Sequence, residues 1–567
     1  MKSRTVASDG VRLAVYEQGD PAKPTVLLVH GYPDTHLMWN DVAVQLAEDF
    51  HVVSYDTRGS GKTTAPSTVE GYRLAQLADD LMAVADAVSP DAPVHVVAHD
   101  WGSIQAWEAV TEPANADRIA SYTSISGPCL DHVAHWTRRP SLKTVRQLLH
   151  SWYIGFFHLP VLPTLVWRFW LGRNWGRLLS AVDGVPRRPG HPAPTITKDG
   201  INGMSLYKAN FRAVSANPRE RRTTVPVQVI HPERDRYVTA PLTQNLQKWA
   251  PKVWRRTIPA SHWVALTHPE VVARMATEFI RHVEGEPAPR SLRRAEEGRH
   301  RAPFADQLVV ITGGGSGIGR ATALAFAKQG AEIVVCDRNH DTAAETAALA
   351  GTKAHAYQVN VADEGAVAKF AADVAAAHGI PDVVVNNAGI GHAGALMDAT
   401  TEEWQRVLDV NLWGVIHGCK SFGELMIAGG EGGHIVNVAS AAAYLPSRHL
   451  GVYSTSKAAV FMLSDCLRAE LAAAGVGVST ICPGIVNTNI AGTTTFSGVT
   501  AAEQARKQEA STKAYRRRNF PPERVAAEIV RAVRRKRAVV PVTIEAKIAR
   551  VTSRLFPSAL RRLAARF

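Results

Sequence analysis

Short apolar runs rich in valine and isoleucine alternate with helical patterns along the chain, an arrangement typical of parallel α/β sheets. In the first half, such runs predict buried strands over 94–98 and 225–230. In the second half, they predict strands over 308–311, 333–337 and 434–438. The fold class that follows is α/β, with a separate sheet in each half.

Between the two predicted sheets lies a segment rich in proline, glutamate and arginine, which can bury little apolar surface and is typical of a linker. A chain of 567 residues is also too long for a single hydrophobic core. We therefore predict two domains, at 1–283 and 303–541, joined by a linker over 284–302 and followed by a tail over 542–567.

The cysteines, the N-terminus and the charge distribution indicate the compartment in which the protein works. The five cysteines are scattered without metal-ligand spacing, so we expect reduced thiols and no metal site. The N-terminus lacks a secretory signal, and prolines and charges interrupt the apolar segment 152–171, so we expect a cytoplasmic protein. The formal net charge is +13, and residues 513–567, with sixteen Lys and Arg against three Glu, account for all of it.

Asp100 stands where a nucleophile is expected. It follows the strand over 94–98, and the small residues Ala98 and Gly102 flank it, as a sharp strand-to-helix turn requires. Serine here would indicate an esterase or lipase, whereas an aspartate attacks an sp³ carbon and forms an alkyl-enzyme ester that water then cleaves. The sequence therefore predicts an α/β-hydrolase with an aspartate nucleophile.

The partners of this nucleophile follow it in the order usual for α/β-hydrolases, an acid and then a histidine. His262 would take the proton from the hydrolytic water, and Asp235 would orient the imidazole. Asp131, nearer to the end of the preceding strand, stays open as an alternative acid. The backbone amides of Tyr32 and Trp101 are the candidates for the oxyanion site.

Residues 5–283 resemble the epoxide hydrolase family, with a helical cap expected over 129–222. The resemblance implies hydrolysis of an epoxide to a vicinal diol, with the cap tyrosines Tyr153 and Tyr207 as hydrogen-bond donors to the epoxide oxygen. Ala98, in place of the commoner glycine, departs from the family pattern, as does the dipeptide His231-Pro232. The resemblance rests on three motifs: His30-Gly31-Tyr32-Pro33, Asp56-Thr57-Arg58-Gly59-Ser60-Gly61 and His99-Asp100-Trp101-Gly102.

Two other interpretations stay open. Haloalkane dehalogenases share the aspartate and the following tryptophan, but they need a second halide-binding group, often an Asn at the position that Tyr32 occupies. An interpretation of a different class is a lipid-binding protein that uses degenerate enzyme domains.

A glycine-rich loop opens the second half. It runs Thr312-Gly313-Gly314-Gly315-Ser316-Gly317-Ile318-Gly319 between a strand and a helix, where glycines let the helix N-terminus approach a pyrophosphate. Asp337 ends the next strand, and its carboxylate would accept hydrogen bonds from the ribose hydroxyls, which favours NAD. Arg338 beside it keeps NADP open as the alternative.

Tyr453 and Lys457 lie four residues apart on one predicted helix face. The tyrosine would act as acid and base near the transferred hydride, and the ammonium group would lower the pKa of the phenol. Ser440, just after the strand over 434–438, would hold the substrate oxygen. These three residues predict alcohol/carbonyl oxidoreduction.

Residues 303–541 resemble the short-chain dehydrogenase/reductase family, whose members commonly associate, so we expect a homo-oligomer. The resemblance implies that Asn411 completes a proton relay and that Lys457 also binds the nicotinamide ribose. One departure is Asn360, where an aspartate near the adenine is common. The resemblance places the other cofactor contacts at Thr312, Gly313, Ser316, Gly317, Ile318, Gly319, Asn360, Val361, Asn387, Ala388, Gly389, Pro483, Gly484 and Thr488.

The tail combines apolar and basic positions. Its apolar residues recur at helical spacing, which fits an anionic membrane surface or else a helix packed on the dehydrogenase with a solvated basic face. No nucleic-acid recognition fold accompanies the charge. Together with an aromatic cap, the tail predicts apolar, lipid-like epoxide and alcohol/ketone substrates. The whole architecture resembles the EphD-type fusion proteins of actinobacteria.

Overall fold

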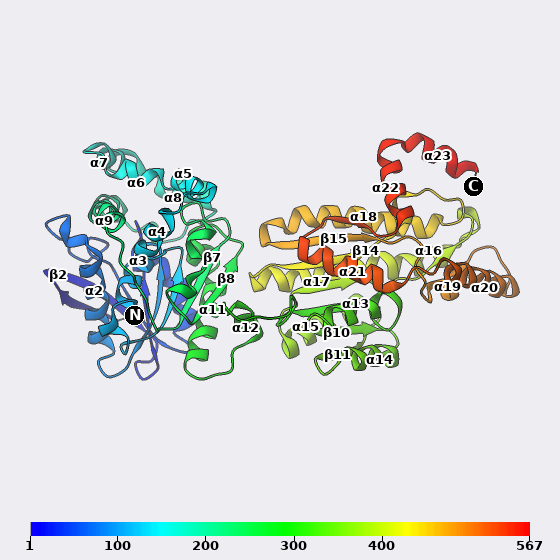
Figure 1. Ribbon diagram of the computed structural model, residues 1–567, viewed down its shortest axis with the longest axis horizontal. Coiled ribbons are helices and arrows are strands. Elements are labelled where there is room, and N and C mark those ends of the chain that lie inside the picture. The colour runs from blue at the N-terminus through cyan, green and yellow to red at the C-terminus, as the bar shows by residue number, and fades with distance from the viewer. Residues whose placement is uncertain (1, 567) are drawn as a thin grey trace. The chain divides into compact units, whose positions relative to one another are not determined.

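Two compact units make up the chain, residues 1–299 and 300–567 (Figure 1). The computed structural model describes residues 2–566, so Phe567, at the end of the predicted tail, lies outside the described residues. Both units have the predicted α/β class, with mainly parallel sheets between layers of helices.

The first unit is built on an eight-stranded sheet with the order β1-β2-β4-β3-β5-β6-β7-β8. Its inner strands are parallel and buried on both faces, which explains their near-continuous runs of Val, Ile and Leu. The strands are Lys2–Ser8 (β1), Val11–Gln18 (β2), Thr25–Val29 (β3), His51–Tyr55 (β4), Val94–His99 (β5), Ile119–Ile125 (β6), Val227–Pro232 (β7) and Val253–Ile258 (β8).

Helices cover both faces of this sheet. One apolar core contains the buried apolar side chains of α1 and α10 and most of those of α11, and a second contains most of those of α2 and α3. These helices are Asn40–Leu46 (α1), Leu74–Val88 (α2), Trp101–Val110 (α3), Val264–Thr267 (α10) and Pro269–Val283 (α11).

A helical cap is inserted between β6 and β7. Its longest helix is tied to the core by Asn210, whose amide donates to the carbonyl of Tyr72 at 2.9 Å and accepts from the amide of Leu74 at 3.0 Å. Across the described part of the chain, no helix has both the length and the apolarity needed to cross a bilayer. The cap contains Leu130–Thr137 (α4), Leu142–His150 (α5), Trp152–Phe157 (α6), Leu162–Val166 (α7), a π-helical turn Trp167–Leu171, Gly172–Asp183 (α8) and Ile196–Ala216 (α9).

The segment predicted as a linker, 284–302, is folded onto the first unit over most of its length. It contains a short helix, Arg290–Ala295 (α12), in which Leu292 is fully buried. Leu292 shares an apolar cluster with Trp254 and Phe279. The difference arises because Leu292 and Ala295, which lie one helical turn apart, can dock a segment whose average composition is polar.

The second unit has a seven-stranded parallel sheet with the order β11-β10-β9-β12-β14-β15-β17, and a separate pair, β13 and β16. All five strands predicted from the sequence overlap observed strands of the two units, namely β5, β7, β9, β10 and β14. The strands of this unit are Leu308–Thr312 (β9), Glu332–Asp337 (β10), Ala354–Gln358 (β11), Val383–Asn386 (β12), His392–Ala393 (β13), Gly433–Val438 (β14), Val476–Cys482 (β15), Thr495–Phe496 (β16) and Val539–Pro541 (β17).

Two layers of helices enclose this second sheet. Side chains of α13, α14 and α21 form the core on one face, and those of α15, α17 and α18 form the core on the other. The helices are Gly317–Ala327 (α13), His340–Ala350 (α14), Glu364–His378 (α15), Thr401–Leu408 (α16), Gly414–Gly429 (α17), Gly451–Leu471 (α18), Ile490–Thr493 (α19), Ala501–Arg518 (α20) and Pro522–Arg535 (α21).

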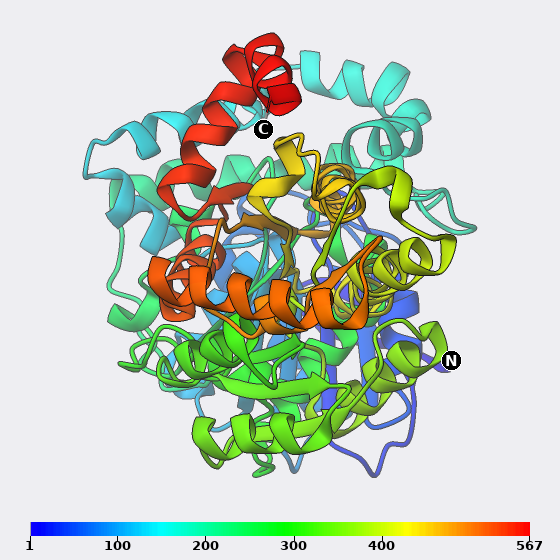
Figure 2. The ribbon, with the colours of Figure 1, turned by 90° about the vertical axis from the view of Figure 1, so that its right-hand side faces the viewer.

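The tail forms two further helices, Ile544–Leu555 (α22) and Pro557–Arg566 (α23), joined by a bend (Figure 2). On α22, Ala546 and Ala549 are buried, and the Ala546 carbonyl accepts from the hydroxyl of Tyr444 at 3.1 Å. The helix therefore packs on the dehydrogenase through its small residues. Its larger apolar side chains stay exposed: Ile544, Ile548, Val551 and Leu555.

Replacing Leu292 by alanine tests whether the supposed linker is part of the first unit. We expect Leu292→Ala to lower the free energy of unfolding by about 2 kcal/mol or more, because the change leaves a cavity. Denaturant unfolding followed by tryptophan fluorescence measures the loss. The control is Leu142→Ala, at a leucine that is 90% exposed, which should stay within about 0.5 kcal/mol of the parent. Equal stability of the two variants would mean that the segment does not dock.

Candidate active sites

The turn at Asp100 is a strained connection between β5 and α3. Its φ is +50°, a region that side-chain-bearing residues rarely adopt. A Cβ on Gly31 would lie 2.4 Å from the Cβ of Asp100, and a Cβ on Gly102 would lie 2.3 Å from the carbonyl oxygen of Val29. Gly31 and Gly102 therefore leave no room for a side chain beside the turn. The close packing of these two glycines holds Asp100 at the carboxyl end of β5.

Asp100, His262 and Asp235 come together in the first unit. The Nδ1 of His262 lies 3.0 Å from Oδ2 of Asp235, and its Nε2 lies 3.6 Å from Oδ2 of Asp100. The other oxygen of Asp235 accepts from the backbone amides of Tyr237 at 2.8 Å and Val238 at 3.0 Å. These bonds hold the buried carboxylate where it orients the imidazole.

The electrostatics of His262 are set by the carboxylates on either side of it. Burial alone would lower its pKa, but Asp235 and Asp100 outweigh burial and raise that pKa to about 10. His262 is therefore an imidazolium at neutral pH. Converting Asp100 into a neutral ester would remove one of the two charges and shift His262 towards the neutral form, which is the form that accepts a proton.

Asp131, the alternative acid, is engaged elsewhere. Its carboxylate accepts from the backbone amide of Arg219 at 2.6 Å and from the guanidinium of the same residue at 2.9 Å. Arg219 and Arg221 also pair with Glu108. This cluster joins the first cap helix to the end of the cap. Of the two candidate acids, Asp235 is therefore the one that meets His262.

Tyr32 contributes two groups to the site. Its backbone amide donates to Oδ1 of Asp100 at 2.7 Å, the position needed to stabilise an oxyanion formed from that carboxyl group. Its hydroxyl donates to the carbonyl of Gly200 in the cap at 3.0 Å. Trp101 is the first residue of α3, where backbone amides have no partner within the helix. The Tyr32 amide thus meets the carboxyl group of Asp100, and the Trp101 amide stands at the start of the helix that follows it.

Tyr153 on α6 and Tyr207 on α9 belong to one aromatic cluster above Asp100. Their ring centroids are 5.9 Å apart, and the ring of Tyr207 lies 4.9 Å from that of Trp101. Burial, reinforced by the charge of Asp100, raises the pKa of both phenols well above the usual value. Both tyrosines therefore stay protonated and can donate hydrogen bonds.

Sequence reasoning missed two residues near this site. The ring of Tyr237 lies 4.8 Å from that of His262 and 5.6 Å from that of Tyr153. Asp183, at the end of α8, is buried beside this group, and burial raises the pKa of its carboxyl. The signal for Tyr237 was its place two residues after Asp235. Nothing local marks Asp183, because the fold of the cap alone brings it to the site.

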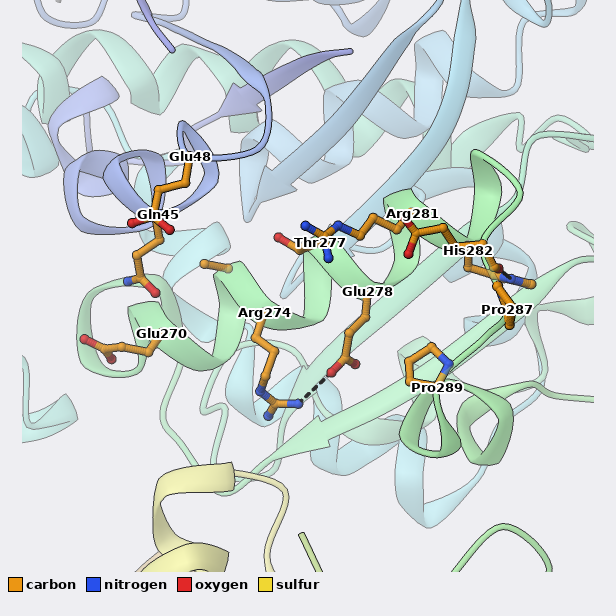
Figure 3. A pocket seen from close by; sticks show the side chains of 12 residues that line it. Gln45, Glu48, Glu270, Arg274, Thr277, Glu278, Arg281, His282, Pro287 and Pro289 are labelled. Carbon is orange, nitrogen blue, oxygen red and sulfur yellow. Dashed lines mark hydrogen bonds and ion pairs between the residues drawn. The ribbon is translucent and has the colours of Figure 1, made fainter. Parts of the chain in front are cut away.

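A separate hollow of about 500 Å³ lies along α11 (Figure 3). Arg274 and Glu278 of this helix form an ion pair at 3.0 Å, and Pro287 and Pro289 line another part of the hollow. Its lining is largely charged and includes none of the predicted site residues. We therefore place the chemistry of the first unit at Asp100 and not in this hollow.

The glycine-rich loop of the second unit leads from β9 into α13 and is shaped for close approach of a ligand. Gly313 and Gly317 have φ values of +62° and +54°. A Cβ on Gly319 would lie 2.1 Å from the carbonyl oxygen of Gly313, so no larger residue fits there. Thr488 lies against the loop, since a Cβ on Gly317 would come within 3.1 Å of its methyl carbon. The residues present therefore fit a dinucleotide pyrophosphate.

Asp337 follows the predicted geometry at the end of β10. One carboxylate oxygen accepts from the amide of Gly315 in the glycine-rich loop at 3.1 Å, and Arg338 beside it is exposed. Asn360 accepts from the amide of Ala362 at 3.2 Å, a bond that an aspartate would also make. The substitution at Asn360 therefore leaves the local turn intact.

The remaining predicted contacts lie in loops at the carboxyl ends of the strands. Thr312 is held by Asn387, whose amide group donates to the carbonyls of Thr312 and Gly313, both at 3.0 Å. Ser316 precedes the first turn of α13, which contains Ile318. Val361 lies in the loop after β11. The loop after β12 contains Ala388 and Gly389, and the loop after β15 contains Pro483 and Gly484.

Ser440, Tyr453 and Lys457 gather between β14 and α18. The ammonium of Lys457 lies 6.0 Å from the ring centroid of Tyr453 and donates to the carbonyl of Val438 at 3.0 Å. Asn411 lies in a π-helical turn, a feature that often occurs at functional sites. Its side-chain amide accepts from the backbone amide of Ile390 and donates to the carbonyl of the same residue. All four predicted catalytic residues of this unit are thus brought to one region.

The expected lowering of the Tyr453 pKa is not found. Burial raises that pKa to about 12, and the hydroxyl of Ser440 offsets burial only in part. Burial also lowers the pKa of Lys457 to about 8. The prediction was wrong because it counted the charge of the ammonium and left out the effect of burying both groups.

A group of possible metal ligands lies near the amino ends of β10 and β11, although the sequence predicts no metal site. The ligand atoms of its three residues, Glu332, His355 and His378, lie within 4.8 Å of one another. The two ring nitrogens of His378 lie 3.2 Å from Glu332 and 3.0 Å from the hydroxyl of Tyr357. The structure thus brings together three possible metal ligands that the sequence did not mark as a site.

Comparison with known proteins agrees with the division into two enzymes. Residues 24–269 match the family model described as alpha/beta hydrolase fold, and residues 307–497 match the one described as short chain dehydrogenase. The fold and the sites thus define an α/β-hydrolase joined to a short-chain dehydrogenase/reductase.

The similarity extends along the whole chain. Proteins of Mycobacterium tuberculosis and Mycobacterium bovis named "Probable oxidoreductase EphD" are 45% identical over 579 residues, which cover 99% of this chain and 98% of theirs. A solved short-chain dehydrogenase/reductase from Burkholderia phymatum, in complex with NAD, is 30% identical, with 46% of this chain and 96% of that chain covered and a TM-score of 0.42. The chain belongs to the EphD family of fusion proteins, as predicted, and its dehydrogenase unit takes an NAD(P) cofactor.

Asp100→Asn tests the charge arrangement around His262. We expect the pKa of His262 to fall from about 10 towards its usual 6.5, because one of two adjacent negative charges is lost. Titration of the imidazole by NMR measures the shift. Since the folded-state pKa is raised, the imidazolium stabilises the parent below about pH 6.5, and that stability is lost as pH rises through about 10. The surface variant Asp79→Asn is the control, and an equal shift in both variants would refute the arrangement.

Proposed function

We propose that the first unit hydrolyses an epoxide to a vicinal diol and that the second unit interconverts an alcohol and a carbonyl with NAD. The observation that supports the epoxide assignment is the pair Tyr153 and Tyr207 above Asp100. Opening an epoxide develops negative charge on oxygen, and two protonated phenols are the donors that this charge needs. Binding a halide requires no acid, so the phenol pair favours an epoxide over a haloalkane.

In the first step of this proposal, a carboxylate oxygen of Asp100 attacks an epoxide carbon, and the carbon–oxygen bond of the ring breaks. Tyr153 and Tyr207 stabilise the oxygen that leaves. The ester formed on Asp100 is neutral, so the His262 imidazolium becomes more acidic and its proton goes to that oxygen. The step ends with an alcohol, an ester and a neutral imidazole.

In the second step, neutral His262 takes a proton from water while the water oxygen attacks the ester carbonyl. The amides of Tyr32 and Trp101 stabilise the oxyanion. Collapse of this intermediate releases the diol and restores the carboxylate of Asp100 beside an imidazolium. The two protonation states of His262 therefore alternate through one turnover, and no external base is needed.

In the second unit, the bound nicotinamide cofactor would accept or donate a hydride. Ser440 holds the substrate oxygen, and the phenol of Tyr453 gives or takes its proton. Lys457, with its lowered pKa, and Asn411 connect that phenol to solvent. Asp337 favours NAD because its carboxylate repels a 2′-phosphate.

We extend the proposal to apolar, lipid-like substrates and to a cytoplasmic homo-oligomer with peripheral membrane contact through α22. The exposed apolar stripe of α22, flanked by Lys547, Arg550 and Arg554, supports the membrane contact. The aromatic lining around Tyr153 and Tyr207 supports an apolar substrate.

Substitutions at Asp100 and the cap tyrosines test the hydrolase. With an epoxystearate, Asp100→Ala should abolish diol formation, and Tyr153→Phe and Tyr207→Phe should each lower kcat about a hundredfold. Tyr357→Phe, in the other unit, is the control. In a single turnover with excess enzyme in ¹⁸O-water, the diol should stay unlabelled, because its new oxygen comes from Asp100. Label in that first diol would mean direct attack by water and would refute the ester.

Cofactor preference tests the dehydrogenase. With a long-chain secondary alcohol, Asp337→Ala should raise the ratio of kcat/KM with NADP to that with NAD by about tenfold or more, because the charge that repels the 2′-phosphate is gone. Asp373→Ala, which removes a surface carboxylate, should leave the ratio unchanged. Tyr453→Phe should abolish turnover with both cofactors. If neither Asp100→Ala nor Tyr453→Phe alters any turnover, the result favours the alternative of a lipid-binding protein with degenerate enzyme domains.

A further inference from the structure

The outer side of the cap exposes more apolar surface than its own packing explains. The inward side chains of these helices, such as Phe157 and Trp167, are buried and complete the cap core. Single exposed hydrophobic residues are ordinary, but a contiguous group marks a binding surface. Eleven large apolar side chains are exposed on consecutive elements of the cap, and we call them the outer cap face: Leu142, Val145, Leu148, Leu149, Trp152, Leu159, Val161, Leu162, Leu165, Phe169 and Trp170.

Helix α5 shows that this exposure is built into the sequence. Its buried residues include the polar Thr144 and Gln147, whereas its leucines and valine face outward, with Leu142 90% exposed and Leu149 71% exposed. Gln147 anchors the helix, since its amide donates to the carbonyl of Tyr237 at 2.8 Å and accepts from the hydroxyl of Thr239 at 2.6 Å. An amphipathic helix that packs by its polar side presents its apolar side to a partner.

Charge identifies the kind of partner. Residues 132–182 contain no aspartate or glutamate and seven arginines and lysines. All seven side chains are exposed: Arg138, Arg139, Lys143, Arg146, Arg168, Arg173 and Arg177. An apolar face surrounded by basic side chains matches a bilayer with anionic headgroups, where arginine can reach the phosphates while Trp and Leu enter the acyl boundary. A second copy of the same face would bring like charges together, which disfavours self-association.

We propose that the outer cap face docks on the surface of an anionic lipid bilayer. The helices α5, α6 and α7 lie at one end of the first unit (Figure 1), so they can meet a flat surface together. Their shortness keeps the contact interfacial, without a membrane span. Trp152 and Trp170 are 69% and 55% exposed and suit the headgroup boundary, where an aromatic ring can be apolar at one end and wet at the other.

Docking here would place lipid beside the hydrolase site. Trp152 on the outer cap face and Tyr153 in the aromatic cluster are adjacent residues of α6, so this one helix would contact both the bilayer and the site. The docking itself does not depend on the chemistry at Asp100, and vesicle binding and turnover are separate measurements.

Vesicle binding by the full chain tests the proposal. We expect the chain to co-sediment with phosphatidylcholine vesicles that contain phosphatidylglycerol, to bind pure phosphatidylcholine vesicles weakly, and to be released by salt. The combined variant Leu142→Ser, Leu149→Ser and Phe169→Ser should weaken binding about a hundredfold, because three apolar contacts are lost. The combined variant Arg146→Gln and Arg173→Gln should weaken it about tenfold.

The control combines Val44→Ser, Val69→Ser and Leu349→Ser, which remove exposed apolar residues outside the cap. It should bind vesicles as the parent does, and all variants should keep the circular dichroism spectrum and Tm of the parent. If the cap variant binds as the parent does, another surface, such as α22, mediates the contact and the proposal fails. It also fails if the parent does not bind vesicles and light scattering shows that the parent is a dimer and the cap variant a monomer, because the outer cap face would then be a dimer interface.

Discussion

The backbone turn at Asp100 is the constraint on which the first unit depends. Glycines approach it from three segments: Gly31 meets its Cβ, Gly102 packs on β3, and a Cβ on Gly127 would lie 2.2 Å from its carbonyl oxygen. The turn cannot relax without breaking these contacts, so the strained φ persists. Because the turn is rigid, the carboxyl group meets the amide of Tyr32 on one side and His262 on the other without further adjustment. Preorganisation of this kind is what electrostatic catalysis requires.

Burial alone would lower the pKa of both His262 and Lys457, but the two pKa values shift in opposite directions. It disfavours the cation in both cases, yet the pKa of His262 rises to about 10 and that of Lys457 falls to about 8. The difference lies in their neighbours, since two carboxylates face His262, whereas the ammonium of Lys457 donates to a backbone carbonyl. The first site therefore holds a proton that the loss of one carboxylate charge would release. A pKa of about 8 brings the titration of the lysine of the second site closer to neutral pH.

Motifs that depend on local backbone geometry could be predicted from the sequence. The turn at Asp100 and the glycine-rich loop before α13 belong to this group, because each spacing has one structural solution. Features that depend on long-range packing could not. Asp183 reaches the site only through the fold of the cap, and the docking of Leu292 depends on Trp254 and Phe279 from other elements. The pKa of Tyr453 was misjudged for a related reason, because sequence shows a neighbouring charge but not the depth of burial.

The cap illustrates why composition alone misleads. Its aromatic and aliphatic residues indicate a hydrophobic core, and part of that indication holds, since Trp167 and Phe157 are buried. On α5 the same pattern has the opposite meaning, because Gln147 and Thr144 occupy the side that packs. A periodic pattern gives the two faces of a helix but not which face is inside. Here hydrogen bonds from Gln147 decide the orientation, and the apolar face that they turn outward is explained by a partner and not by folding.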